Sequence, residues 1–251
     1  MEWKIIHIEE TDSTNRWLRD YTSGASTDSP CQSVESGASL DAPVAVVVAN
    51  YQTAGRGCGT NTWESERGKN LLFSVLLHPK DVAANQQFRL SMAVSLAICE
   101  ALDNLIGNVS IKWPNDIYWR NGKICGILIE QTLQGNSIKD CIVGVGLNVN
   151  QQRFVSGAPN PVSLWQICEQ ETDREALLRD ILVRLERILG EPVRDRYLSR
   201  LYRRQGFHPY VDSSGVFMAE IADVEDDGHL VLSDDSGSVR RYAFKEVQFV
   251  I

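Results

Sequence analysis

The chain of 251 residues lacks the patterns that mark several large protein classes. Its apolar runs are all shorter than the roughly eighteen residues of a membrane span, and its first residues, MEWKIIHIEE, lack the basic-then-apolar pattern of a signal peptide. Basic residues are not in excess: the net charge is −8, and no Lys/Arg stripe offsets it. We therefore expect a cytoplasmic protein that binds neither membranes nor nucleic acid.

Recognisable metal and disulfide patterns are also missing. The six cysteines include no Cys-x-x-Cys, and the four histidines form no His-x-x-x-His or Glu-x-x-His pair. This spacing is neither that of a zinc site nor that of a small disulfide framework, so we expect free thiols and no protein-ligated transition metal. With 43% hydrophobic and 23% charged residues, the composition is that of an ordinary globular protein with one substantial core, or with one large and one small domain.

The stretch from Val44 to Leu77 contains the most informative loop. Two apolar runs, VAVVVAN and LLFSVLL, are typical of buried strands and bracket twenty polar, glycine-rich residues. Long loops between packed strands are usually functional. Gly55-Arg56-Gly57 places a guanidinium between two residues without a Cβ, which suits a phosphate or carboxylate. The loop is neither a Walker A motif nor a GxGxxG motif, so alone it is a weak signal.

The periodicity of the chain predicts an α+β fold. We expect a mixed β-sheet with helices packed on one face over residues 1–190, a linking helix over 191–205, and a small β-barrel domain over 206–251. Ser163 is expected to begin a short helix within the first domain.

A second group of residues strengthens the interpretation of the loop. Lys112-Trp113-Pro114-Asn115-Asp116 follows a predicted strand, and Lys123 opens the next apolar run. Two lysines, an arginine and an aspartate around one loop would neutralise a polyphosphate and hold Mg²⁺. Taken separately, each lysine fits a solvated surface charge better than a site residue.

With these residues in view, the sequence resembles a biotin–protein ligase (biotin–[acetyl-CoA-carboxylase] ligase). The resemblance rests on five blocks in the family's order: Glu10-Thr11-Asp12-Ser13-Thr14-Asn15, Gln52-Thr53-Ala54-Gly55-Arg56-Gly57, Trp63-Glu64-Ser65, Lys112 to Asp116 with Gly122 to Gly126, and Gly144-Val145-Gly146-Leu147-Asn148-Val149-Asn150. It is strong over residues 5–150, loose over 160–200, and reaches the C-terminal part, where it implies an SH3-like barrel, only as a pattern.

The resemblance implies a reaction in two steps, in which biotin reacts with ATP to give biotinyl-5′-AMP and a lysine of a biotin carboxyl carrier protein then takes the biotinyl group. It implies catalytic roles for Arg56, Lys123, Asp116 and Lys112. The biotin-binding set that it implies is Ser13, Thr14, Asn15, Gln52, Gly55, Arg56, Gly57, Lys123 and Gly126. The adenylate-binding set is Arg56, Gly57, Cys58, Trp63, Asn115 and Asn148.

The same resemblance implies ATP and Mg²⁺ as cofactors, and it allows a homodimer. Some relatives carry an N-terminal DNA-binding domain; this sequence opens on a predicted strand, so no DNA-binding role is expected. Two alternatives stay open: a lipoate–protein ligase or octanoyl transferase of the same fold, although the expected Arg-x-x-Gly-Gly-Gly run is missing, and a biotin-binding protein without catalysis. Ser13 and Thr14 also fit plain helix caps, and Trp63 fits lid packing.

One position departs from the family pattern. After Gly57, relatives often carry a polar or basic residue that reaches the adenylate phosphate, whereas this chain has Cys58 and no charge until Glu64. A charge-assisted hydrogen bond contributes about 1.5–3 kcal/mol. The hypothesis is that this protein holds biotinyl-AMP less tightly than relatives with arginine there, unless backbone N–H groups of the loop suffice.

Overall fold

The computed structural model describes residues 3–23, 33–34, 45–79, 86–135 and 137–251. The chain divides into two compact units, Met1–Ala84 with Gly122–Asp180 and Asn85–Asn121 with Ile181–Ile251. The division falls within helix α4 (Arg174–Leu189). The domain bounds expected from the sequence stay a prediction.

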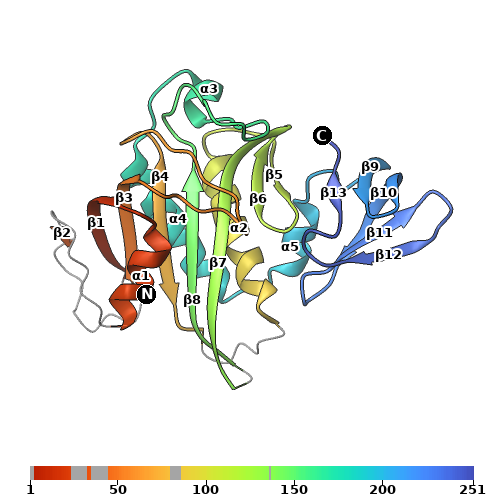
Figure 1. Cartoon of the computed structure of the whole chain (residues 1–251), viewed down its shortest axis with the longest axis horizontal. Coiled ribbons are helices and arrows are strands. Elements are labelled where there is room, and N and C mark those ends of the chain that lie inside the picture. The colour runs from red at the N-terminus through yellow and green to blue at the C-terminus, as the bar shows by residue number, and fades with distance from the viewer. Residues whose placement is uncertain (1–2, 24–32, 35–44, 80–85, 136) are drawn as a thin grey trace. The chain divides into compact units, whose positions relative to one another are not determined.

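The first unit is built on a mixed β-sheet. Its strand order is β2-β1-β3-β4-β8-β7, in which β1 and β3 are parallel and the other pairs are antiparallel. The two longest strands, β7 and β8, run side by side (green in Figure 1). The predicted mixed sheet is thus confirmed. The bounds are β1 Lys4–Thr11, β2 Ser33–Val34, β3 Ala45–Gln52, β4 Leu71–Leu77, β7 Gly122–Gln134 and β8 Ser137–Leu147.

Helices cover both faces of this sheet. Helix α1 (Thr14–Ser23) packs Trp17 and Leu18 into a cluster with Val47 on one face. His7 lies between Ile6 and Ile8 of that cluster along β1, so its side chain is on the other face of the sheet. There its Nδ1 atom is 3.6 Å from Oε1 of Glu175 in α4. The sequence analysis placed the helices on one face. The difference follows from β3 and β4, whose apolar residues are buried on both sides and therefore need cover on both.

Helix α3 (Leu164–Cys168) also belongs to the first unit. The side-chain oxygen of Ser163 accepts from the backbone N–H of Gln166, whose own side chain accepts from the N–H of Ser163. This capping box confirms the helix start predicted at Ser163.

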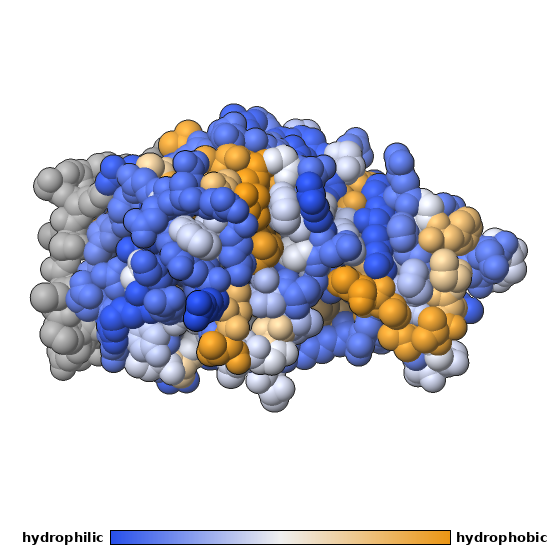
Figure 2. Space-filling view, turned by 90° about the horizontal axis from the view of Figure 1, so that it is seen from above, coloured by the Kyte–Doolittle hydropathy of each residue, from blue (hydrophilic) through white to orange (hydrophobic). Residues whose placement is uncertain are grey.

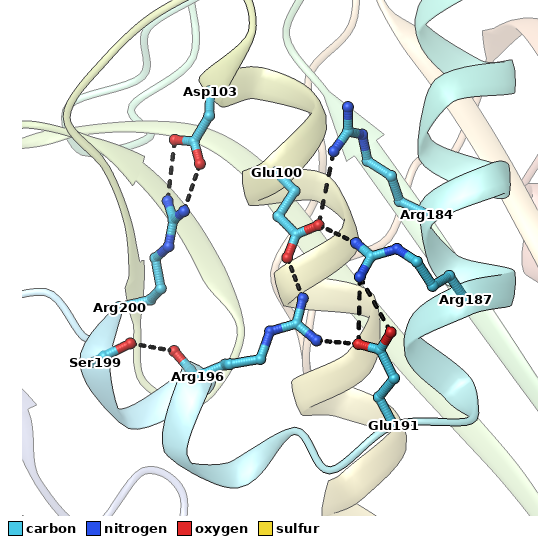
Figure 3. A network of polar contacts seen from close by, with 8 residues as sticks. All are labelled: Glu100, Asp103, Arg184, Arg187, Glu191, Arg196, Ser199 and Arg200. Atoms are coloured by element: carbon cyan, nitrogen blue, oxygen red, sulfur yellow. Dashed lines mark hydrogen bonds and ion pairs between the residues drawn. The ribbon is translucent and has the colours of Figure 1, made fainter.

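The second unit contains α2 (Phe88–Asp103), the antiparallel pair β5 (Val109–Lys112) and β6 (Asp116–Trp119), the later turns of α4, and α5 (Arg194–Ser199). Its helices are joined by a charge network (Figure 3). Arg184, Arg187 and Arg196 all approach the carboxylate of Glu100, and the last two also reach Glu191. The Glu100 carboxylate of α2 therefore pairs with arginines of both α4 and α5.

The last 46 residues of the second unit form an antiparallel sheet of five strands. Its order is β12-β11-β10-β9-β13, with β12 and β13 at the two edges, so the sheet is open and not a closed barrel. The predicted β-structure at the C-terminus is confirmed as an antiparallel sheet, and the expected closure of a barrel is corrected. The bounds are β9 His208–Asp212, β10 Gly215–Val224, β11 Leu230–Asp234, β12 Val239–Tyr242 and β13 Gln248–Phe249.

The face of the molecule seen in Figure 2 is largely polar. Figure 2 shows hydrophilic residues over most of one face, with hydrophobic residues gathered in separate patches. Among the residues that the structure describes, no helix is both long and apolar enough to span a bilayer.

Candidate functional site

The glycine-rich loop after β3 is attached to the turn between β1 and α1. The backbone N–H groups of Thr53 and Ala54 donate to the carbonyls of Thr11 and Asp12, at 2.9 and 3.1 Å. The loop and the Ser13-Thr14-Asn15 block are far apart in sequence, and these bonds place them side by side.

Further along, the loop folds back on itself as a narrow ribbon. The N–H of Trp63 donates to the carbonyl of Gly55 at 2.9 Å, and the N–H of Gly57 donates to the carbonyl of Asn61 at 2.8 Å. A Cβ on Gly55 would lie 2.6 Å from the Trp63 carbonyl oxygen, which is closer than side-chain carbons approach. Glycine at position 55 is therefore required for this fold of the loop.

Helix α1 is capped by a side chain from β3. The Gln52 Oε1 atom accepts from the backbone N–H of Thr14 at 2.8 Å, while Ser13 donates its own N–H to Asp12 at 2.6 Å. The cap at Thr14 thus comes from tertiary structure rather than from the Ser13 hydroxyl. Because Oε1 is occupied, the Gln52 amide presents its Nε2 donors to other partners.

A buried hydrogen-bond chain continues from this cap. Ser74 Oγ lies 2.7 Å from Thr14 Oγ1 and 2.6 Å from Asn15 Oδ1, and Thr14 Oγ1 lies 3.1 Å from Gln52 Oε1. An amide oxygen only accepts, so the Thr14 hydroxyl donates to Gln52 Oε1 and the Ser74 hydroxyl donates to Asn15 Oδ1, with Thr14 Oγ1 as a second acceptor for the Ser74 proton. The bond from Ser74 fixes the Asn15 amide with its NH₂ group toward β7.

Three glycines of β7 and β8, namely Gly126, Gly144 and Gly146, leave a surface without side chains beside these residues, which we call the glycine floor. Gly126 and Gly146 are register partners, and the Trp63 indole packs on both: a Cβ would fall 2.8 Å from the ring at Gly126 and 2.5 Å at Gly146. A Cβ on Gly144, two residues earlier on β8, would collide with the Asn15 amide. The absence of three Cβ atoms thus makes room for Asn15 and Trp63.

Arg56 is paired with a carboxylate on the same side of β7. Its Nη2 atom lies 3.5 Å from Glu130 Oε1, and Arg19 Nη2 of α1 lies 2.8 Å from the same oxygen. The other oxygen, Oε2, accepts from Asn15 Nδ2 at 2.8 Å. The buried chain from Gln52 therefore ends at a carboxylate held by two guanidinium groups.

Lys123 and Asn148 lie at the other end of the glycine floor. Lys123 Nζ is 5.8 Å from the centre of the Trp63 ring, a cation–π distance. Asn148, which is 2% exposed, donates its Nδ2 to the Val162 carbonyl at 3.1 Å. Within the described parts of the chain, Asn148 Oδ1 and Trp63 Nε1 are buried without a hydrogen-bond partner. Buried polar atoms of this kind usually have a partner, so these two are candidates for ligand contacts.

Glu64 fixes the end of the ribbon. Its two carboxylate oxygens accept the backbone N–H groups of Val155 and Ser156 at 2.9 and 2.8 Å, and Gln151 Nε2 lies 3.3 Å away. Desolvation raises the pKa of Glu64, but the hydrogen bonds from Ser156, Val155 and Gln151 outweigh it, so the pKa is lowered overall. The carboxylate joins the Trp63 segment to the loop after β8.

Three predicted site residues belong to the second unit. Lys112 and Asp116 are register partners across the β5–β6 hairpin, and Asn115 lies in the turn between them. Lys112 Nζ lies 5.1 Å from the ring centre of Phe249. The Pro114 carbonyl accepts from the buried Tyr197 hydroxyl at 2.7 Å, which holds the turn. The grouping of these three residues with Arg56 and Lys123 stays a prediction.

Two buried cysteines, Cys99 and Cys141, are not activated as nucleophiles. Burial raises the pKa of the Cys141 thiol to about 12 and also raises that of Cys99, so both are thiols at neutral pH. Cys58, in the loop, is a half-buried free thiol.

The structure adds residues to the site that the sequence analysis did not assign. Ser74 joins the Thr14 and Asn15 side chains, Glu130 meets both Arg56 and Arg19, and Gly144 and Gly146 complete the floor. Ser74 carried a signal, since it is the one polar residue in the apolar run LLFSVLL. Glu130 also carried one, because it lies an even number of residues from Gly126 and so on the same face of the strand.

Comparison with known proteins finds one protein family. The sequence profile of the Biotin/lipoate A/B protein ligase family matches residues 23–148. The chain is 28% identical over 221 residues to the Bifunctional ligase/repressor BirA of Bacillus subtilis, covering 79% of this chain and 64% of that protein. It therefore spans a little under two thirds of that relative's length.

Two further likenesses cover more of the related protein. A Biotin--[acetyl-CoA-carboxylase] ligase of Paracoccus denitrificans is 30% identical over 213 residues, which is 76% of this chain and 85% of the relative. Among solved structures, the biotin protein ligase from Aquifex aeolicus in complex with biotin and ATP superposes with a TM-score of 0.74 at 24% identity, over 98% of this chain and 99% of that one. At that identity the superposition shows a shared fold.

Proposed function

The chain belongs to the Biotin/lipoate A/B protein ligase family, and on that premise we propose that it is an ATP-dependent biotin–protein ligase. In the first step the carboxylate of biotin attacks the α-phosphorus of ATP, pyrophosphate leaves, and biotinyl-5′-AMP forms. In the second step the amine of a carrier-protein lysine attacks the mixed anhydride, an amide bond forms, and AMP leaves. The carrier is a biotin carboxyl carrier protein.

One observation carries the proposal: the glycine floor, on which Asn15 and Trp63 pack, has neutral hydrogen-bonding groups beside it and a lysine at one end. Gln52 and Thr14 supply the neutral groups, and Lys123 supplies the cation. Biotin has matching chemistry, with a ring urea at one end and a carboxylate at the other. The Gln52 Nε2 donors suit the urea oxygen, and the Lys123 ammonium suits the carboxylate.

The adenylate part of the site is supported by the unpartnered polar atoms. Asn148 Oδ1 accepts and Trp63 Nε1 donates, and both are buried and unpaired within the described residues. A nucleotide offers both complementary groups. ATP enters as its Mg²⁺ complex, and Arg56 and Lys123 add positive charge where the phosphate and carboxylate react, because such transfers depend mainly on positioning and charge neutralisation.

For the second step we assign Asp116 to the incoming amine. Its register partner Lys112 supplies a compensating positive charge on the same hairpin. The carboxylate would orient the lysine ammonium of the carrier and help to remove its proton.

Lipoate is a poorer match for the same site. Its dithiolane ring has no urea, so the Gln52 amide would be buried against a group that cannot pair with it. A site built for a hydrogen bond discriminates strongly against a ligand that lacks the partner. The site therefore favours biotin.

The test is incubation of the protein with ATP, a carrier domain and either labelled biotin or labelled lipoate. The proposal predicts release of pyrophosphate and labelling of the carrier by biotin alone. Lys123→Gln should lose both, while Lys139→Gln, which removes an exposed lysine of β8, should keep both. Labelling by lipoate would point to the other branch of the family, and binding of biotin without pyrophosphate release would point to a non-catalytic protein.

A further inference from the structure

Glu130 is a site residue whose charge opposes the proposed ligand. It lies on the same face of β7 as Gly126, and it is 23% exposed. Its carboxylate contacts Arg56, Arg19 and the Asn15 amide at once. A carboxylate beside a site for anions needs a reason, because it competes with the ligand for the same guanidinium.

The position of Glu130 on β7 keeps its partner Arg56 away from Lys123. Lys123 and Glu130 are seven residues apart on β7, so at about 3.3 Å per residue their Cα atoms are about 23 Å apart. While Arg56 is paired with Glu130, it is directed toward the Asn15 end of the floor and away from Lys123. An anion held at Lys123 therefore gains the Arg56 charge only if Arg56 leaves Glu130.

We propose that Glu130 and Arg19 are positioning residues: Glu130 holds Arg56 in a resting pair, and Arg19 neutralises Glu130 when Arg56 transfers to the ligand anion. This inference rests on the proposed function, since it takes biotin carboxylate or its adenylate phosphate as the anion. A carboxylate left without a partner in a half-buried site is costly, so the second arginine lowers the cost of the exchange. Arg19 is the closer partner, at 2.8 Å against 3.5 Å for Arg56, which fits this division of roles.

The inference predicts opposite effects for the two charges. Glu130→Gln removes the competitor but keeps an oxygen that accepts from Asn15 Nδ2, so biotin should bind more tightly, by about three- to fivefold as for a partly exposed ion pair. Arg19→Met leaves Glu130 dependent on Arg56, so biotin should bind more weakly by about the same factor. Arg19→Lys should restore the affinity of the unsubstituted protein.

The decisive comparison is Arg19→Met in two backgrounds, measured by titration calorimetry with biotin and with neutral biotin amide. In the Glu130→Gln background, Arg19→Met should have no effect, because there is no carboxylate to neutralise. Arg16→Met is the matched control: Arg16 is an equally exposed arginine of α1, but its partner is Asp12. It should leave biotin affinity unchanged, and no variant should change the affinity for the amide.

The inference would be overturned if Arg19→Met weakened biotin binding equally in both backgrounds, or if Arg16→Met weakened it as much as Arg19→Met does. Either result would show a general attraction of anions. Weaker binding of both ligands to Glu130→Gln would show a structural role and overturn it too. If Glu130→Gln does not fold, the test uses the Arg19 variants alone. Arg19→Met should then bind biotin more weakly and biotin amide equally well, and Arg19→Lys should restore the affinity for biotin. Failure of the unsubstituted protein to bind biotin at all would remove the proposed function together with the inference, whereas binding that ignores all these substitutions would remove the inference alone.

Discussion

The indole of Trp63 lies on Gly146, where a Cβ would fall 2.5 Å from ring atom Cε2. The two residues are 83 positions apart, since 146 − 63 = 83. The contact places an aromatic ring from the glycine-rich loop directly on the backbone of β8, so the fold of the loop depends on a missing side chain in the sheet.

Gly146→Ala should therefore displace the Trp63 ring. The expected cost is about 1–3 kcal/mol in the free energy of unfolding, as for an overpacked site. Urea denaturation measures it, and the indole N–H resonance of Trp63 reports the displacement. Gly157→Ala is the control, because a Cβ there meets nothing within 4 Å. Identical behaviour of the two variants would contradict the packing of Trp63 on β8.

Ser74→Ala tests the buried hydrogen-bond chain. The substitution leaves Asn15 Oδ1 without the hydroxyl that lies at 2.6 Å. A buried acceptor that loses its donor costs about 1–3 kcal/mol. Ser95 is a matched buried serine whose hydroxyl has no partner among the described residues, so Ser95→Ala should change the free energy of unfolding by less. Equal costs in chemical denaturation would show that the Ser74 contacts contribute nothing.

Glu64 should make the free energy of unfolding depend on pH. Its pKa is lowered in the folded state, so the carboxylate stabilises the fold above its ordinary value of 4.5 and loses this contribution as the pH falls through the lower, folded value. The stability difference between the protein and Glu64→Gln should thus be largest above pH 5 and shrink at more acidic pH. Unfolding curves recorded between about pH 3.5 and 7 measure it. Glu66→Gln, at an exposed neighbouring position, controls for the change in net charge. A difference that stays constant with pH would refute the assignment.

Cys58→Arg tests the departure from the family pattern, given the proposed function. A guanidinium that reaches the adenylate phosphate should slow release of biotinyl-AMP by about ten- to a hundredfold, the factor that corresponds to 1.5–3 kcal/mol. Release is measured by dilution of the preformed complex, and Cys58→Ser controls for loss of the thiol without a new charge. Equal release rates for all three proteins would mean that the backbone of the loop already holds the phosphate.

The local patterns that the sequence predicted correctly are those that depend on neighbouring residues. The apolar runs on each side of the glycine-rich loop became β3 and β4, and α3 begins at Ser163 as expected. Hydrogen bonds within a few residues and a period of two set these features, and the order of the motifs pointed to the family that the comparisons then showed.

Side-chain contacts between residues far apart in the sequence could not be predicted in the same way. The Thr14–Ser74 contact joins residues 60 positions apart, and the Asn15–Glu130 contact joins residues 115 positions apart. Helices also cover both faces of the sheet, because the strand order buries β3 and β4 on both sides.

By itself, then, the sequence determined a glycine-rich loop with an arginine between two buried strands, and it predicted lysines beside that loop. Only the tertiary structure decided that Arg56 pairs with Glu130, that Arg19 shares this carboxylate, and that Trp63 lies on bare backbone at Gly146. The reason is physical: strand pairing fixes which distant side chains meet, and each meeting depends on charge and on the space left by an absent Cβ.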